Sequence, residues 1–306
     1  MIASRMGATV YPLTTMPELP EVEITARRLD EAVRAQVVES VRTPGINVLK
    51  TFDPPLQSIE GHAITGIGRR GKQFTISVDN GLVVLVHLMS AGRLQLFDKR
   101  ASMKDRSSRF LVRIPSPPPT PNADRELRLR EFGTKQAAWV KLLRADELES
   151  EEVIATLGPE AWPDPPEDFA ELLRPGGARP LHGVLRDQRV IAGIGRSWVD
   201  EILWTAMLSP FKRGDDLDDD EAARLRAATV QVLGDALAVY EEKVKLPIPD
   251  KLPLPLKVHR RNGESCPRCG ATIEAVHYED YVMCYCPQEQ TGGRVLKDRR
   301  LSRLLK

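Results

Sequence analysis

The stretch Met16-Pro17-Glu18-Leu19-Pro20-Glu21-Val22-Glu23 decides how this chain of 306 residues begins to fold. Removal of Met16 would leave Pro17 with a free secondary amine, a good nucleophile toward a sugar aldehyde. Glu18 would lie beside it as a proton donor and acceptor, and a carboxylate next to an activated amine is the minimum for Schiff-base chemistry. The alternative is that Pro17 and Pro20 only open a helix, because proline is favoured in a first helical turn.

A helix and a series of short strands are predicted after this stretch. Val22, Ala26, Leu29 and Val33 recur at helical spacing and predict an amphipathic helix to about Ala35. Strand-like runs separated by turn residues follow at residues 37–42, 63–67, 73–78, 82–88, 110–114 and 137–143. Residues 16–146 are therefore predicted to form an N-terminal β-sandwich domain behind a helix.

The pattern turns helical after a proline-rich joint at residues 159–166. Helices are predicted at residues 169–173, 181–185, 199–207 and 218–242, which gives a second domain at residues 160–246. A proline-spaced linker leads from there to a cysteine-rich C-terminal domain at residues 256–306. The fold class is thus an α+β multidomain protein.

Charge is distributed unevenly, although the net charge of +1 says nothing by itself about a nucleic-acid partner. Residues 294–306 hold six Lys or Arg against the single acid Asp298, whereas residues 215–221 are strongly acidic. Such asymmetry indicates one face built for phosphates and another left to solvent. No apolar run approaches the roughly 18–20 residues of a membrane span, and residues 1–15 lack the apolar centre of a secretory signal.

The four cysteines all lie between Cys266 and Cys286, which favours a metal site in a reducing cytoplasm over a disulfide framework. Cys266-Pro-Arg-Cys269-Gly270 has the spacing of a zinc knuckle, and Cys286 follows at a span suitable for a zinc ribbon. The fourth ligand is predicted to be Cys284 or Glu289, with His277 a weaker candidate. The alternative is a ribbon held by its core without metal.

Two further motifs suggest anion binding. Lys72, in Arg69-Arg70-Gly71-Lys72 at the start of a predicted strand, can hold a phosphate or assist an elimination, unless it is only a solvated charge on an edge strand. The Gly193-Ile194-Gly195 turn joins two predicted helices and leaves backbone amides free at a helix N-terminus, next to Arg196. The alternative is that the glycines only allow two helices to pack closely.

Four ordered motifs resemble the formamidopyrimidine-DNA glycosylase and endonuclease VIII family of DNA base-excision repair. They are the opening Pro17–Glu23 stretch, Arg70-Gly71-Lys72, the helix–two-turn–helix sequence from Leu185 to Gly195, and the C-terminal zinc ribbon. The tail from Gln290 to Lys306 is similar to that of an actinobacterial branch. The resemblance covers residues 16–306.

The resemblance implies a bifunctional DNA glycosylase and abasic-site lyase that acts on damaged duplex DNA through an iminium on Pro17. Glu18 would move protons, and Lys72 would support phosphate binding and strand cleavage. The residues expected to contact DNA are Arg70, Met89, Gly193, Gly195, Arg196, Arg294, Arg299 and Arg300. Met89 is the candidate wedge that fills the space of a flipped base, with Phe132 a weaker one.

A cytoplasmic, nucleoid-associated bacterial monomer with one structural zinc ion is also expected, with no membrane partner. The chain departs from the family pattern in several places. Residues 1–15 precede Met16 and are expected to be absent from the mature protein, because Pro17 must be free. Arg196 stands where the family has asparagine, Tyr281 where many relatives have a ribbon arginine, and His182 where some have lysine.

The departures motivate a second hypothesis, a non-catalytic relative that binds abasic or distorted DNA and recruits other factors. A generic zinc-ribbon adaptor for nucleic acid is a third, but it leaves the first 150 residues without a purpose. Cleavage of abasic DNA separates the first hypothesis from the second, because only the enzyme leaves cut products.

Overall fold

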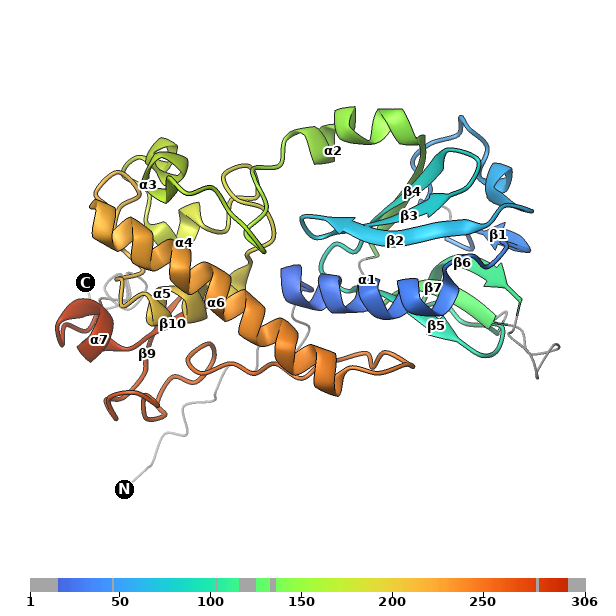
Figure 1. Ribbon diagram of the computed structural model, residues 1–306. Helices are drawn as coiled ribbons and strands as arrows, with labels where there is room; N and C mark the ends of the chain where they lie inside the picture. Colours follow the sequence, from blue (N-terminus) through green and yellow to red (C-terminus); the bar gives the residue numbers. More distant parts are fainter. Residues whose placement is uncertain are drawn as a thin grey trace, which may run out of the picture.

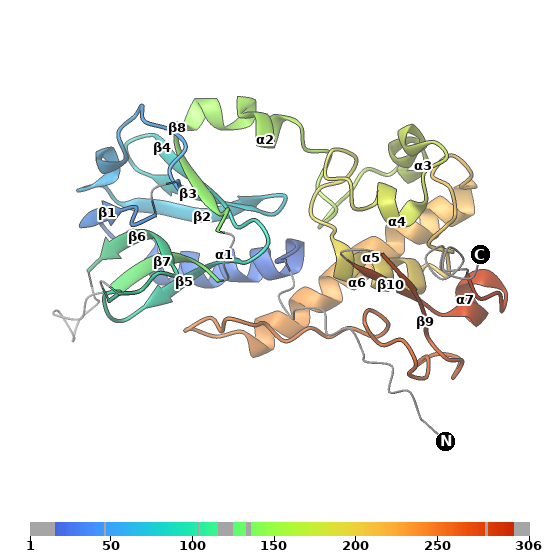
Figure 2. The same cartoon turned by 180° about the vertical axis from the view of Figure 1, so that it is seen from behind.

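The computed structural model describes residues 16–45, 47–102, 104–115, 125–132, 136–278 and 281–296. Two lobes lie side by side, a β-sandwich with one long helix against it and a helical lobe that carries the cysteine ribbon (Figures 1 and 2). The extension at residues 1–15 and the candidate DNA contacts Arg299 and Arg300 lie outside the described residues.

Helix α1 (Leu19–Val33) fixes the start of the fold and points its N-terminal end at the helical lobe (Figure 1). Pro20 stands in its first turn, where the missing N–H costs nothing. The backbone N–H of Glu18 donates to Glu21 Oε2 at 2.9 Å, which closes the helix entry. Val22 and Leu29 are fully buried, as the helical spacing predicted.

Two four-stranded antiparallel sheets form the sandwich, with the orders β1-β6-β7-β5 and β2-β3-β4-β8. Their bounds are β1 (Ser40–Arg42), β2 (Ile64–Arg70), β3 (Gln73–Val78), β4 (Leu82–His87), β5 (Gly92–Phe97), β6 (Ser108–Ile114), β7 (Arg125–Glu131) and β8 (Trp139–Arg144). The sequence did not predict β5 or β7. It also placed Arg69–Lys72 at the start of a strand, which is wrong. Arg69 and Arg70 end β2, and Gly71 and Lys72 form the turn to β3, because Gly71 adopts a positive φ of 54°.

The helical lobe follows the sandwich in the chain. Its helices are α3 (Phe169–Leu173), α4 (Leu181–Val184), α5 (Arg196–Thr205) and the long α6 (Asp219–Lys243), with a short 3₁₀ turn at Arg174–Gly176. The short helix α2 (Glu152–Ala155) and the 3₁₀ turn at Ala145–Ser150 pack instead against β4 and β8 of the sandwich, and a further 3₁₀ turn at Leu56–Ile59 contacts β1. Asp218 caps α6 by accepting from Glu221 N at 2.8 Å. One continuous apolar core runs from Leu19 in α1 to Ile248 beyond α6, so the two lobes are packed through α1.

The C-terminal ribbon consists of β9 (Glu274–His277), the antiparallel strand β10 (Val282–Tyr285) and helix α7 (Pro287–Thr291). Val282 pairs with His277 in the ribbon register. A small core of its own, with Val258, Ile273 and Cys284, joins the ribbon to Trp204 at the end of α5. In the part of the chain that the structure describes, no helix is long and apolar enough to cross a membrane.

Candidate active site between the two lobes

A cavity of about 200 Å³ lies where the N-terminal end of α1 meets the helical lobe. It brings together residues that are far apart in the chain: Met16, Pro17, Lys72, Gln73, His87, Leu88, Met89, Arg186 and Gln188. Three of the predicted site residues, Pro17, Lys72 and Met89, therefore share one hollow. The predicted nucleophile, the predicted phosphate ligand and the predicted wedge come from three separate segments.

The position of Pro17 is set by the close approach of α1 to the Gly193-Ile194-Gly195 turn. Leu19 N donates to the carbonyl oxygen of Gly193 at 3.0 Å. Gly193 has a φ of 105°, and a Cβ there would lie 2.4 Å from Leu19 Cδ1. A side chain at Gly193 would therefore push α1, and Pro17 with it, away from the turn.

Glu18 is buried and its carboxylate lies at the N-terminus of α5. Oε1 accepts from Ser197 N at 2.8 Å and Oε2 from Trp198 N at 3.4 Å. A Cβ on Gly195 would approach Glu18 Cδ to 2.3 Å. The free amides that the sequence assigned to an external anion are thus occupied by Glu18, as the macrodipole favours. Gly193 and Gly195 therefore allow Leu19 and Glu18 to pack closely against the turn. A contact between these glycines and DNA stays a prediction.

Lys72 is held by the same turn, because its Nζ donates to the carbonyl oxygen of Ile194 at 2.8 Å. Burial is the largest cause that lowers the pKa of Lys72, and the nearby carboxylates Glu18 and Glu21 oppose it. The guanidinium groups of Arg186 and Arg196 lower the Lys72 pKa further. Lys72 and Arg186 line the cavity, and Arg196 lies close enough for its charge to act on Lys72, so this end of the cavity attracts phosphate.

Glu21 is a buried acid in contact with both lobes, and the sequence did not select it. Trp198 Nε1 donates to Glu21 Oε1 at 3.1 Å, and the Tyr240 hydroxyl donates to the same oxygen at 2.6 Å. Burial, with the charge of Glu18 adding to it, raises the pKa of Glu21 from 4.5 to about 7. The only sequence signal for this role was its place one helical turn after Glu18.

A second cavity of about 330 Å³ lies against Pro17 and Glu21. Much of its wall is apolar and comes from the proline-spaced linker that follows α6. These linker residues are Ile248, Pro249, Lys251, Leu252, Leu254 and Leu256. Sequence reasoning treated this segment as a joint only, and its repeated proline–leucine pattern was the signal that it forms a wall.

Met89 lies in the turn between β4 and β5 with a positive φ of 48°, which is uncommon for a residue with a side chain. Its N–H donates to His87 Nδ1 at 3.0 Å, and the His87 ring stacks on Trp139. Gly92 closes the turn by donating to the carbonyl oxygen of Leu88 at 2.8 Å. The turn thus presents Met89 at the cavity. Phe132 does not line this cavity, and its ring packs under the guanidinium of Arg130.

Three departures from the family pattern lie together, because His182 and Arg196 both contact the ring of Tyr281. Tyr281 stacks on His182 with ring centroids 5.7 Å apart, and the guanidinium of Arg196 lies 5.2 Å from the Tyr281 centroid. His182 is buried and hydrogen-bonded to Asp200 at 3.1 Å, and burial lowers its pKa. His182 therefore has a packing and hydrogen-bonding role, whereas Tyr281 lies among cations.

The other candidate DNA contacts lie farther out. Arg70 is half-exposed and pairs with Glu149 at 2.9 Å. Arg294 is exposed on the segment after α7. Neither lines the cavity that contains Pro17.

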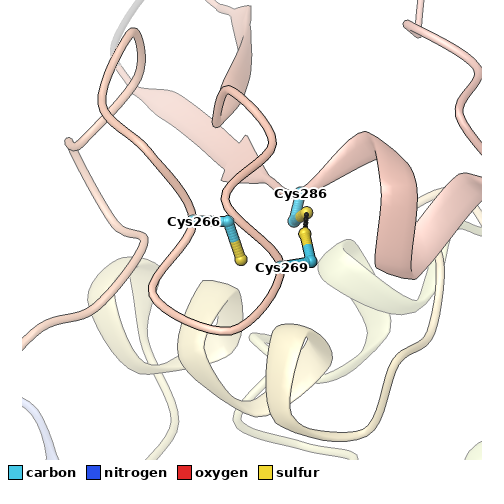
Figure 3. Close-up of side chains that lie close together, drawn as sticks. All are labelled: Cys266, Cys269 and Cys286. Carbon is cyan, nitrogen blue, oxygen red and sulfur yellow. Dashed lines mark hydrogen bonds between the residues drawn. The ribbon is translucent and has the colours of Figure 1, made fainter.

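The ribbon contains a cysteine cluster in which the thiols of Cys266, Cys269 and Cys286 point toward one another (Figure 3). Their sulfur atoms all lie within 4.8 Å of one another, with Cys269 Sγ and Cys286 Sγ 3.4 Å apart. Burial raises the pKa of Cys266, yet backbone N–H groups of Cys269 and Arg268 bring the net pKa below the ordinary value. Three converging sulfurs fit a tetrahedral zinc ion, which prefers thiolates.

Neither predicted fourth ligand belongs to this cluster among the described residues. Cys284 is buried in the ribbon core, and its Sγ accepts from Arg260 N at 3.2 Å. Burial and the charge of Asp200 raise the pKa of Cys284 to about 12. Glu289 pairs with Arg268 at 2.5 Å, and the weaker candidate His277 is likewise outside the cluster.

Comparison with known proteins shows which family has this arrangement of domains. Residues 16–134 match the formamidopyrimidine-DNA glycosylase N-terminal domain and residues 157–247 match the H2TH domain of the same glycosylase. The formamidopyrimidine-DNA glycosylase of Moorella thermoacetica is 32% identical over 85% of this chain and 94% of its own length. An uncharacterized formamidopyrimidine-DNA glycosylase-like protein of Mycobacterium tuberculosis is 41% identical over 49% of this chain and 94% of its own length.

Solved structures share the fold. The Lactococcus lactis enzyme in complex with DNA that contains N7-benzyl-Fapy-dG superposes with a TM-score of 0.78 at 24% identity, covering 90% of this chain and 100% of its own. The same enzyme with DNA that contains an abasic site gives a TM-score of 0.77. The predicted order of sandwich, helix–two-turn–helix and cysteine hairpin is confirmed. This chain belongs to the formamidopyrimidine-DNA glycosylase family.

Proposed function

We propose that this protein is a bifunctional DNA glycosylase and abasic-site lyase that excises oxidised bases from duplex DNA and then cuts the strand. The observation that carries the proposal is the shared cavity of Pro17, Lys72 and Met89. Relatives named formamidopyrimidine-DNA glycosylase match nearly their full length, which supports the reaction class.

Pro17 is the proposed nucleophile. Once it is the N-terminal residue, its secondary amine attacks C1′, the bond from C1′ to the base breaks, and the base leaves with a proton. The lone pair on the Pro17 nitrogen then forms a C=N bond to C1′ as the C1′–O4′ bond breaks, and Glu18 gives a proton to O4′, so the sugar ring opens to an iminium. The iminium withdraws electrons, so a base removes a proton on C2′ and the electron pair expels the 3′ phosphate. Water then hydrolyses the iminium and regenerates the amine.

Glu18 is proposed to move the protons, and Lys72 to hold phosphate beside the sugar. The two buried hydrogen bonds from α5 hold the carboxylate of Glu18, which follows Pro17 in the chain. The hydrogen bond from Lys72 Nζ to the carbonyl oxygen of Ile194 holds the ammonium group at the cavity. Both residues depend on the same glycine turn, so the site acts as one unit.

The damaged nucleotide must leave the duplex to reach Pro17, which costs a few kcal/mol of unstacking. Met89 is the proposed wedge, since its turn presents it at the cavity. The apolar cavity on the other side of Pro17 has about 330 Å³ for the flipped base. Arg70, Arg196 and Arg294 are proposed to contact phosphates along the strand.

A single zinc ion is proposed to stabilise the ribbon through Cys266, Cys269 and Cys286. When bound, zinc supplies folding free energy to a small domain. The reaction on the sugar is assigned to Pro17 and its neighbours.

Replacing the nucleophile tests the proposal directly. Pro17→Gly, in protein that begins at residue 17, should cut abasic duplex at least a hundredfold more slowly while binding it with nearly unchanged affinity. Unaffected cleavage would refute Pro17 as the nucleophile. Tight binding without cleavage by the unmodified protein would favour the lesion-binding alternative.

A further inference from the structure

Arg186 is a cation at the wall of the cavity that contains Pro17, and it follows α4 at the entry to the glycine turn. Its Nη1 is buried and has no hydrogen-bond partner among the residues that the structure describes. A buried donor left without a partner costs about 1–3 kcal/mol, and more when it is charged. Such a group is a candidate for binding an external acceptor.

The guanidinium of Arg186 is held in place by an aromatic ring. Its Cζ lies 4.3 Å from the centroid of Tyr281. The Tyr281 ring also stacks on Tyr278, at 4.3 Å between ring centroids, and on His182, and it lies near the guanidinium of Arg196. The Tyr281 ring is therefore fixed by stacking, and the guanidinium of Arg186 packs against it. An arginine that is positioned without consuming its donors is preorganised for a planar, bidentate acceptor.

The charges around the cavity indicate an anion. Lys72 also lines the cavity, and the Arg186 and Arg196 guanidiniums lie close enough to lower the pKa of Lys72. Glu18, the acid whose charge acts most strongly on Lys72, already accepts from two amides of α5. A phosphate would satisfy the unpartnered nitrogen of Arg186 and relieve the repulsion among the cations.

We propose that Arg186, positioned by Tyr281, binds a DNA phosphate next to the sugar that Pro17 attacks. This inference rests on the proposed function, since it takes damaged DNA as the ligand. Arg186 binds the strand, and Tyr281 is a positioning residue that acts through Arg186. The ribbon hairpin thus reaches the site through an aromatic ring that holds an arginine of the helical lobe.

The test compares Arg186→Gln with Arg189→Gln in protein that begins at Pro17. Arg189 lies in the same loop, its side chain is 76% exposed and pairs with Asp187, and it does not line the cavity. The probe is a duplex with a tetrahydrofuran abasic analogue, which cannot be cleaved. Affinity is measured over a range of salt concentrations, and thermal melting verifies that each variant is folded.

Arg186→Gln should weaken binding roughly tenfold or more. It should also lower the slope of log affinity against log salt by about 1, the signature of one lost phosphate contact. Arg189→Gln should match the unmodified protein in both respects. Binding by Arg186→Gln that equals the unmodified protein, or an equal loss in both variants, would overturn the proposal.

The role of Tyr281 has its own readout. Tyr281→Phe keeps the ring and should bind normally, whereas Tyr281→Ala should lose several-fold in affinity. Added to Arg186→Gln, the alanine variant should cause little further loss; fully additive losses would contradict positioning through Arg186. These binding assays need no bond cleavage. If the unmodified protein fails to cut abasic DNA, the lyase activity is refuted, and the binding data still decide whether Arg186 contacts a phosphate.

Discussion

The junction around Pro17 and the cysteine ribbon are built in different ways. At the junction, carbonyl oxygens of the glycine turn accept from Leu19 N and Lys72 Nζ, and the N–H of Ser197 in α5 donates to Glu18, through hydrogen bonds of 2.8–3.0 Å. In the ribbon, three side chains converge and the fourth position is not filled from the predicted residues. Backbone-defined geometry survives changes of surrounding side chains, whereas a metal site needs each ligand. The junction is therefore expected to be specified more tightly than the ribbon.

The largest expected effect comes from closing the gap that Gly195 leaves for Glu18. Gly195→Ala would place a methyl group 2.3 Å from Glu18 Cδ, so the carboxylate or α5 must move. We expect about 1–3 kcal/mol of lost stability. Cleavage of abasic DNA should fall roughly a hundredfold, because small misplacements of reacting groups are costly.

Gly234→Ala is the matched control for this variant. Its Cβ would meet only Trp162 Nε1 at an ordinary 3.5 Å within helix α6. It should retain cleavage and raise stability by about 0.5–1 kcal/mol. Normal cleavage by Gly195→Ala would show that the junction is less constrained than the contacts indicate.

The second largest effect is expected from removing a zinc ligand in the ribbon. Cys269→Ala should reduce bound zinc from about one ion per chain to near zero. It should lower the thermal stability of the ribbon, with a smaller, roughly tenfold, loss in DNA affinity. Cys284→Ala is the control and should retain zinc, because its thiol lies outside the cluster. Zinc analysis of the purified variants decides this, and loss of zinc from Cys284→Ala would make Cys284 the fourth ligand.

The smallest effect concerns the pH dependence of stability. Because the pKa of Glu21 is raised from 4.5 to about 7, the folded protein binds this proton more tightly than the unfolded chain. The free energy of unfolding should therefore fall as pH rises from 4.5 toward 7, by on the order of 1–3 kcal/mol from this group. Denaturant titrations at several pH values should show a flatter dependence in Glu21→Gln. If Glu21→Gln and the unmodified protein showed the same dependence of stability on pH, the pKa of Glu21 would not be raised in the folded protein.

The sequence predicted the helix α1, most of the sandwich and the order of the lobes, because local periodicity and turn residues report those features. It missed β7 because its charged residues are buried in pairs, such as Arg128 with Glu126 at 2.5 Å, which disguises a buried strand as a solvated one. Pro17, Lys72 and Met89 were selected by motif. Arg186, Glu21 and the linker wall were not, because their roles depend on contacts between segments more than 50 residues apart.

The most direct measurement of the central claim is borohydride trapping on abasic-site DNA, with protein made to begin at Pro17 and peptide mapping of the adduct. The account predicts a covalent protein–DNA adduct whose modified residue is Pro17. Absence of an adduct despite tight binding, or an adduct mapped to Lys72, would contradict it.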